Sequence, residues 1–183
     1  MGKIKEQLPV KFFAAITCQH SVNIPEVIEN IEVKFGKIDR KSPIFNFDDF
    51  TNYYSSEMGT DLKKLFVSFE CLALPELLIE RKIQSNKVEY EISDSSIRKV
   101  NIDPGYITEA KMILATTKDY SHRIYLGKGI FGDLHLKFEK KSFQPQLWTY
   151  PDYQQELSIR FFDEMRNIYR QQLAGVQFET DNI

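Results

Sequence analysis

Apolar and polar positions near the start of the chain follow two patterns in succession. Residues 10–18 (VKFFAAITC) form a short apolar run rich in aromatic and β-branched side chains, which predicts a buried strand. Apolar residues then recur at helical spacing through 24–35, which predicts an amphipathic helix. We expect Asn23 and Glu26 to form a capping box at its start, and Gly36 to end it.

The next segments continue this order of strands and helices. Extended stretches are predicted at 38–47, 65–72, 88–92 and 97–102. Pro43 interrupts the first of them, which is typical of an edge strand. Pro75 suits the first turn of a helix that runs to about Gln84. The resulting order β-α-β-β-α-β predicts a ferredoxin-like core.

Strands dominate the predicted second half of the chain. We expect them at 111–117, 122–126 and 130–138. The sequence Gly127-Lys-Gly129 between the last two is typical of a hairpin turn. Residues 157–173 show the pattern of an amphipathic helix. We therefore predict an α+β fold, in which the ferredoxin-like core is extended by further antiparallel strands and a C-terminal helix.

Length and composition are those of an ordinary globular protein. Hydrophobic residues make up 42% of the chain and charged residues 27%. A chain of 183 residues buries enough surface to fold without a metal or a disulfide. We expect a single domain over residues 1–183, with an ordered core at about 8–173 and a loose tail at 175–183.

Charge and targeting signals narrow the expected partners and location. The net charge of −2 gives no broad basic surface, which argues against non-specific nucleic-acid binding but not against a local basic pocket, and makes a nucleic-acid partner an unfavoured prediction. Cys18 and Cys71 lie far apart in strand-like surroundings, so we expect both to be reduced thiols. The sequence shows no signal peptide, and no apolar stretch approaches the roughly 20 residues that span a bilayer. We therefore expect no membrane association and a cytoplasmic location.

The segment 115–125 carries the densest group of chemically capable side chains. Lys118 and Arg123 are suited to hold an anion, Arg123 by a bidentate fork and Lys118 as a point charge. His122 is the candidate for proton transfer, with a carboxylate such as Asp119 setting its tautomer. The alternative is a solvated hairpin whose charges pair locally and contribute little.

Tyr53, Tyr54 and Glu57 form a second candidate group, between two predicted strands. Their rings and carboxylate could line a polar and aromatic pocket and stack on a ligand ring. A short helical turn that buries Tyr54 and Met58 explains the same pattern without any ligand.

The segment NIDPGY at 101–106 predicts a turn, because its Pro-Gly pair fits the central positions of a type II turn. Asp103 would then bond the turn backbone. A functional Asp103 would instead accept from a ligand hydroxyl or, with Asp119 and Glu57, recruit Mg²⁺ through carboxylate oxygens.

The sequence patterns of nucleotide-binding proteins are either absent or stand in the wrong context. The string GKGIFG at 127–132 matches G-x-G-x-x-G, but the residues after it alternate like a strand, whereas the dinucleotide motif must open a helix. No Walker A sequence is present, and Thr117-Lys-Asp119 is one residue short of the guanine-reading N-K-x-D. The chain therefore lacks the sequence features of a conventional P-loop GTPase.

Four ordered motifs give the chain a family resemblance. They are YYxxEMG at 53–59, NxDPGY at 101–106, ATxKDxxHRxYL at 115–126 and WTYPDY at 148–153. They resemble a bacterial family known only as a domain of unknown function, some of whose members are labelled GTP-binding protein. The resemblance covers about residues 8–173 and implies no particular reaction. It implies that the following residues occupy motif positions: Tyr53, Tyr54, Glu57, Arg98, Asn101, Asp103, Tyr106, Lys118, Asp119, His122, Arg123, Thr149 and Asp152.

Three hypotheses of function follow from the sequence. The leading one is a pocket for a small anionic molecule, such as a nucleotide or a phosphorylated metabolite, with His122 as the proton-transfer group if a reaction occurs. A non-catalytic protein-interaction module predicts an exposed apolar surface and no deep pocket around His122. RNA binding on the sheet requires Phe66, Tyr125 or Phe131 to be exposed beside basic residues.

Overall fold

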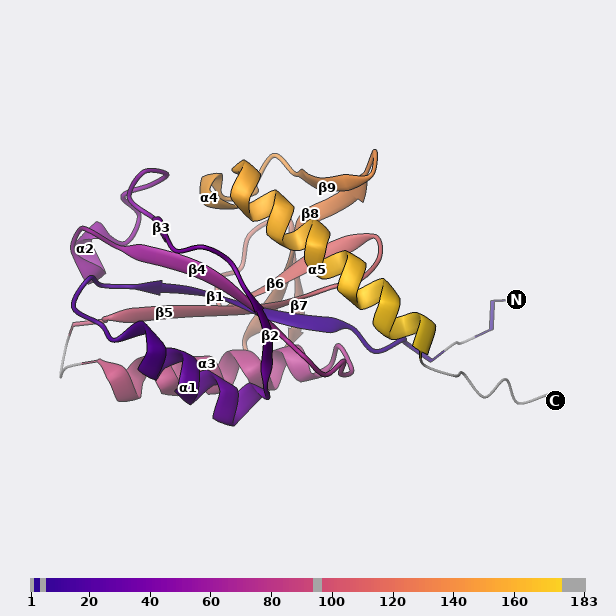
Figure 1. Cartoon of the computed structure of the whole chain (residues 1–183), viewed down its shortest axis with the longest axis horizontal. Coiled ribbons are helices and arrows are strands. Elements are labelled where there is room, and N and C mark those ends of the chain that lie inside the picture. Colours follow the sequence, from indigo (N-terminus) through magenta and orange to yellow (C-terminus); the bar gives the residue numbers. More distant parts are fainter. Residues whose placement is uncertain (1, 4–5, 94–96, 176–183) are drawn as a thin grey trace.

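The computed structural model of the chain describes residues 2–3, 6–93 and 97–175, which form one antiparallel sheet with helices on both faces (Figure 1). The strands are β1 (Lys11–Cys18), β2 (Ile38–Lys41), β3 (Phe45–Asn46), β4 (Lys63–Phe69), β5 (Val100–Ile107), β6 (Lys111–Thr116), β7 (Arg123–Gly127), β8 (Ile130–Glu139) and β9 (Ser142–Pro145). The helices are α1 (Ile24–Phe35), α2 (Ser55–Met58), α3 (Leu77–Ile92), α4 (Pro151–Gln154) and α5 (Glu156–Gly175). The predicted α+β class is confirmed.

The strand order confirms the predicted core and its extension. Neighbouring strands of the described sheet run β2-β4-β1-β5-β6-β8-β7, with β3 paired to β4 and β9 paired to β8. The part β2-β4-β1-β5, in which α1 and α3 connect the strands, is the arrangement of a ferredoxin-like core. Strands β6 to β9 lengthen the sheet beyond β5, and the terminal helix α5 packs back onto it.

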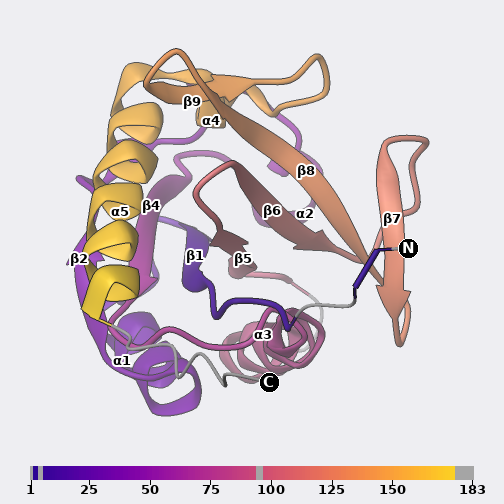
Figure 2. The same ribbon diagram turned by 90° about the vertical axis from the view of Figure 1, so that its right-hand side faces the viewer.

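The sheet buries both of its faces at the centre. Helices α1 and α3 lie on one face and α5 crosses the other (Figures 1 and 2). Successive residues of β1 serve the two faces, so that Phe12 and Ile16 join the cluster under α1 and α3 while Phe13 joins the cluster under α5. Phe13 meets Phe162 of α5 edge-on, with ring centroids 4.9 Å apart. Burial on both sides explains why β1 is apolar throughout.

The chain from Val88 to Ile92 differs from the prediction. These residues were expected to be extended, but they form the last turns of α3, which runs well past Gln84. Their apolar and polar residues alternate in steps of two, which imitates a strand. The alternation has another cause, since Glu89 is buried to bond other polar groups and Tyr90 is 84% exposed.

The predicted turn at NIDPGY is also wrong, because residues 101–106 lie inside β5 and pair with β1. The capping box is not formed either. Asn23 precedes α1, but its side chain makes no capping hydrogen bond, and its backbone carbonyl accepts from the N–H of Glu26 at 3.1 Å. The hairpin at Gly127 and Gly129 is confirmed, and both glycines have positive φ angles, 133° and 76°. The glycine string therefore opens strand β8 and no helix.

The C-terminal tail and the possibility of a membrane-spanning helix were both subjects of prediction. Except for Gly175, the tail predicted at 175–183 lies outside the described residues. Among the residues that the structure describes, none of the helices combines the length and the hydrophobicity needed to cross a bilayer.

Candidate functional site

Strands β5 and β6 are paired at one end and part toward the other. Gly105–Ile107 pair with Met112–Leu114, and in the described part of the chain the preceding residues of β5 have no strand partner on that side. Side chains of α3 replace the missing strand at Ile102. Glu89 accepts the N–H of Ile102 at 2.7 Å, and Lys82 donates to its carbonyl at 3.0 Å. The open strand edge therefore keeps its hydrogen bonds.

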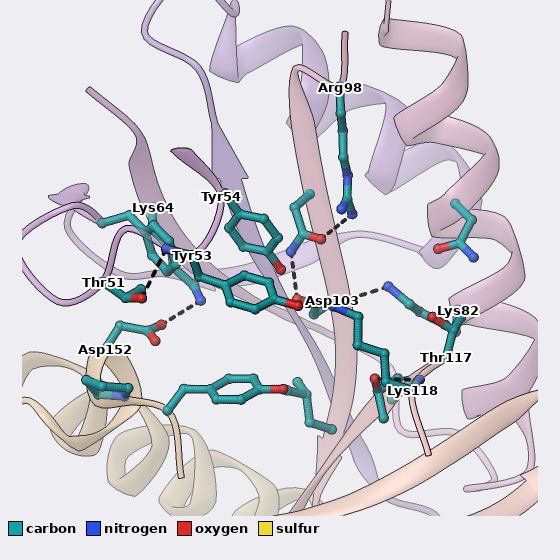
Figure 3. Close-up of a pocket in the computed structure, with 18 of the residues that line it drawn as sticks. Thr51, Tyr53, Tyr54, Lys64, Lys82, Arg98, Asp103, Thr117, Lys118 and Asp152 are labelled. Carbon is teal, nitrogen blue, oxygen red and sulfur yellow. Dashed lines mark hydrogen bonds and ion pairs between the residues drawn. The ribbon is translucent and has the colours of Figure 1, made fainter. Parts of the chain in front are cut away.

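A cavity of about 240 Å³ lies where these two strands part (Figure 3). Its walls come from the loop between β3 and β4, from β4, α3 and β5, from Arg98, from the end of β6 and the loop after it, and from residues 150–152. The predicted ligand-binding residues that line it are Tyr53, Tyr54, Arg98, Asn101, Asp103 and Lys118. The segments 53–59, 101–106, 115–126 and 148–153 all contribute to the wall, although they are far apart in the sequence.

Asp103 is the carboxylate at the floor of the cavity, and both of its oxygens are bonded. Lys82 donates to Oδ1 at 2.9 Å, and the amide of Asn101 donates to Oδ2 at 2.6 Å. Burial raises the pKa of the Asp103 carboxyl, but Lys82 and Asn101 outweigh it and hold this pKa below its usual value. Asp103 is therefore ionised, and its charge is balanced by Lys82.

Arg98 is balanced by carboxylates that stand outside the cavity lining. Its guanidinium donates to Glu89 at 2.7 Å and to Glu57 at 3.3 Å, and also to the amide oxygen of Asn101. Glu57, a predicted ligand and metal residue, is exposed and reaches the site only through Arg98. The positive charge of Arg98 is thus already compensated.

Lys64 and Asp152 form a buried ion pair in the wall, which sequence reasoning did not find as a pair. The ammonium of Lys64 lies 2.6 Å from a carboxylate oxygen of Asp152 and 4.6 Å from the ring centre of Tyr153. A signal was present in the sequence, because strand alternation places Lys64 on the same face as the core residue Phe66. A lysine on the buried face of an apolar strand needs such a partner.

Lys118 differs from the other cations of the cavity. Its ammonium donates to the hydroxyl of Tyr53 and lies 4.6 Å from the centre of that ring, and the two side chains point toward one another in Figure 3. No carboxylate of the described residues forms an ion pair with it. Lys118 and Tyr53 are exposed, which places them at the mouth of the cavity.

Arg123, predicted as an anion ligand, is buried behind the cavity wall. Its Nε donates to Asp133 at 3.0 Å, its Nη1 to the carbonyl of Lys118 at 3.0 Å, and its Nη2 to the hydroxyl of Tyr150 at 2.7 Å. Burial raises the pKa of Asp133, but His135 and Arg123 outweigh it and hold that pKa below its usual value. These contacts occupy the guanidinium, and they indicate that Arg123 positions its neighbours.

The predicted proton-transfer pair does not line the cavity. His122 stacks on Trp148, with ring centroids 4.8 Å apart, and the carboxylate beside its Nε2 is Asp133 at 3.3 Å, not the expected Asp119. Asp119 is exposed and outside the lining. Tyr106 packs on Phe12 at the opposite face of the sheet, with centroids 5.8 Å apart.

The carboxylates predicted to recruit Mg²⁺ are not gathered at one point. Asp103 is held by Lys82 and Asn101, Glu57 contacts Arg98, and Asp119 lies outside the cavity lining. No group of three or more His, Cys, Asp or Glu residues within the described ranges is arranged to hold a metal ion. Mg²⁺ binding stays a prediction.

A family model covers the whole of this cavity. The model described as "Domain of unknown function (DUF4416)" matches residues 8–169, which include every residue of the cavity lining. The chain belongs to this family. No curated protein and no solved structure matches the chain. For this DUF4416 member, the geometry of the cavity is therefore what bears on function.

Proposed function

We propose that the cavity binds a small anionic molecule through a phosphoryl or carboxylate group. The observation that carries this proposal is the charge on Lys118. The lining contains four cationic side chains, Lys64, Lys82, Arg98 and Lys118. Carboxylates pair with the first three at 2.6 to 2.9 Å, and no described carboxylate pairs with Lys118. One positive charge at the cavity mouth is therefore left for a ligand.

The surroundings of Lys118 support an anion more than a cation or a neutral group. An oxyanion would meet the ammonium in a partly enclosed site, where charge interactions are stronger than in bulk water. The hydroxyls of Tyr53, Tyr54, Tyr120 and Tyr150 add polar groups on aromatic walls. A volume of about 240 Å³ suits a small ligand or the head group of a larger one, so nucleotides remain candidates.

The two alternative functions receive different support. RNA binding on the sheet required Phe66, Tyr125 or Phe131 to be exposed beside basic residues: Phe66 is fully buried against α5 and Phe131 is half-buried, whereas Tyr125 is exposed. A protein-interaction module required exposed apolar residues, and Ile124 and Tyr125 on the edge strand β7 are 73% and 61% exposed. The cavity, with a Lys118 that has no carboxylate partner among the described residues, is the more specific feature, so ligand binding is our proposal.

A thermal-shift experiment tests the proposal with three probes at matched ionic strength: inorganic phosphate, succinate and adenosine 5′-monophosphate, each with and without Mg²⁺. A probe present at about 100 times its Kd adds roughly 2.7 kcal/mol of stability, which is a clear rise in melting temperature. We expect at least one probe to give this rise. A rise that needs Mg²⁺ would support the predicted cation.

Lys118→Ala is the decisive variant and Lys111→Ala is its matched control. Both lysines are exposed, and Lys111 stands at the start of β6, the strand that ends shortly before Lys118, and lies outside the cavity lining. We expect Lys118→Ala to weaken binding about tenfold or more, because it removes a charge-assisted hydrogen bond. Its melting temperature without a probe should stay unchanged. Equal affinity in both variants, or no response to any probe, would refute the proposal.

A further inference from the structure

Two tyrosines of the cavity wall accept hydrogen bonds from cations. Arg123 donates to the hydroxyl oxygen of Tyr150, and Lys118 donates to the hydroxyl oxygen of Tyr53. Guanidinium and ammonium groups have no acceptor, so each phenol oxygen must be the acceptor in its pair. We infer that Tyr150 and Tyr53 donate their own phenol protons to an oxygen of the bound anion, and that Arg123 is the positioning residue for Tyr150. This inference rests on the proposed function.

Two hydrogen-bonded side chains, Arg123 and His135, connect Tyr150 to the buried carboxylate of Asp133. Asp133 accepts from Nε of Arg123 at 3.0 Å, and the same guanidinium reaches the Tyr150 hydroxyl at 2.7 Å. The other carboxylate oxygen of Asp133 lies 3.2 Å from Nδ1 of His135. The Nε2 atom of His135 accepts the backbone N–H of Tyr150 at 3.2 Å. Asp133 therefore fixes both the backbone and the hydroxyl of Tyr150.

The tautomer of His135 follows from these contacts. Because Nε2 accepts the N–H of Tyr150, the ring carries its proton on Nδ1 and donates it to Asp133. The centroids of the His135 and Tyr150 rings are 4.6 Å apart, edge-on, which restricts the phenol further. Such support by neighbouring groups is what keeps a binding residue in place before the ligand arrives.

The phenol protons of Tyr53 and Tyr150, whose side chains are 55% and 38% exposed, are left for solvent or for a ligand oxygen that replaces it. In the part of the chain that the structure describes, no acceptor takes the proton of the Tyr150 or the Tyr53 hydroxyl. Both residues line the cavity. Burial raises the pKa of Tyr150 to about 12, so the phenol stays protonated at neutral pH and keeps its donor.

This arrangement defines the chemical class of the ligand atom. Lys118, Tyr53 and Tyr150 offer N–H and O–H donors, so the ligand must present oxygens with free lone pairs. A phosphoryl or a carboxylate group meets this requirement. An ammonium group does not, because it has no lone pair to accept with.

Tyrosine-to-phenylalanine variants test the inference by isothermal titration calorimetry with the same three probes. Tyr150→Phe and Tyr53→Phe remove a hydroxyl and keep the ring, and Tyr125→Phe is the matched control on exposed strand β7, outside the cavity lining. We expect Tyr150→Phe to raise Kd about tenfold, as for a lost hydrogen bond to a charged group. Tyr125→Phe should leave Kd unchanged. Phosphate and succinate distinguish a phosphoryl from a carboxylate source.

Arg123→Lys tests the positioning role. It keeps a cation beside Asp133 but removes the Nη2 donor to Tyr150. We expect it to raise Kd in the chain that retains Tyr150 and to have a clearly smaller effect in combination with Tyr150→Phe, where only the contact of Arg123 with the Lys118 carbonyl is left to be lost. A purely structural role would lower the melting temperature and change Kd equally in both backgrounds.

The outcomes separate this inference from the proposed function. If Lys118→Ala weakens binding and Tyr150→Phe does not, the cavity binds anions but the phenol donor is refuted. If the unmodified protein binds none of the three probes, both the proposed function and the phenol-donor inference are refuted. If Arg123→Lys does not fold, the comparison of Tyr150→Phe with Tyr125→Phe still decides the donor role.

Discussion

Gly105 holds β5 against β1 and β6 at the last pair before the strands part, and replacing it with alanine should destabilise the protein. A Cβ atom there would lie 2.4 Å from Cζ of Phe13 and 2.6 Å from the carbonyl oxygen of Ile113. Ordinary contacts begin at 3.4 Å, so these atoms would have to move by up to 1 Å. Neither can move freely, because Phe13 is fully buried against Phe162 and the other atom is backbone.

The size of the effect follows from two opposing contributions. Overpacking of a close-packed core costs about 1 to 3 kcal/mol, and this contact lies toward the upper end because a backbone atom is involved. Alanine restricts the unfolded chain more than glycine, which recovers about 0.4 to 1 kcal/mol where the native backbone tolerates it. We expect Gly105→Ala to lower the free energy of unfolding by about 2 kcal/mol.

Gly132→Ala is the matched control, since Gly132 also lies in a strand. Its Cβ would approach Cδ1 of Leu126 at 3.3 Å, and this side chain is 41% exposed, so its tip can rotate away. Urea unfolding followed by the fluorescence of the single tryptophan, Trp148, measures both variants. We expect Gly132→Ala to stay within about 0.5 kcal/mol of the unmodified protein. If Gly105→Ala were equally stable, the close packing of β5 on Phe13 would be wrong.

Two further predictions concern charges around the cavity. The pKa of Asp133 is held below its usual value of about 3.9, so its stabilising effect is complete above that value and is lost as the pH falls through the lower folded-state pKa. Urea unfolding from about pH 6 to about pH 2 should show this loss in the unmodified protein and not in Asp133→Asn; equal slopes would contradict it. Lys82→Met should cost about 3 kcal/mol in the same assay, because it leaves Asp103 without its cation. Lys87→Met, exposed on the same helix, should cost nothing, and a similar loss in both would argue against the role of Lys82 at the strand edge.

The parts of the fold that were predictable are those where local pattern and tertiary environment agree. The apolar run of β1 is buried on both faces, and the helical spacing of α1 matches one buried side. The end of α3 was not predictable, because Glu89 is turned inward by its bonds to Ile102 and Arg98, which lie beyond the helix. A local pattern contains no information about such partners.

The Pro-Gly pair in β5 misled the prediction for a related reason. Ile102 directs its peptide groups to α3, on the side where β6 has parted, and Pro104 is two residues further along the same strand. Alternate residues of a strand direct their peptide groups to the same side, so the missing N–H of proline faces the unpaired edge. Glycine is needed at position 105 because a Cβ atom there would collide with the ring of Phe13. Both residues signal a turn in isolation and fit a strand only beside these neighbours.

The sequence indicated which segments line the cavity, but it did not indicate the contacts that each side chain makes there. Motif positions located the cavity wall, and Lys118, Tyr53 and Asp103 do line it. The roles of Arg123 and His122 depend on Asp133, which lies in another strand and stood out in no motif. The hairpin was predicted without its register, and it is the register of β7 on β8 that places Asp133 opposite Arg123.

The parting of β5 and β6 connects the stability of the fold with the chemistry of the cavity. The open strand edge needs hydrogen bonds, and α3 supplies them through Lys82 and Glu89. These two charges are balanced in turn by Asp103 and Arg98, so the charges at the cavity floor cancel in pairs. The charge without a described carboxylate partner stands at the mouth, on Lys118, where the proposed anion would meet it first. Stability and binding should therefore respond to different residues, Lys82 for the fold and Lys118 for the ligand.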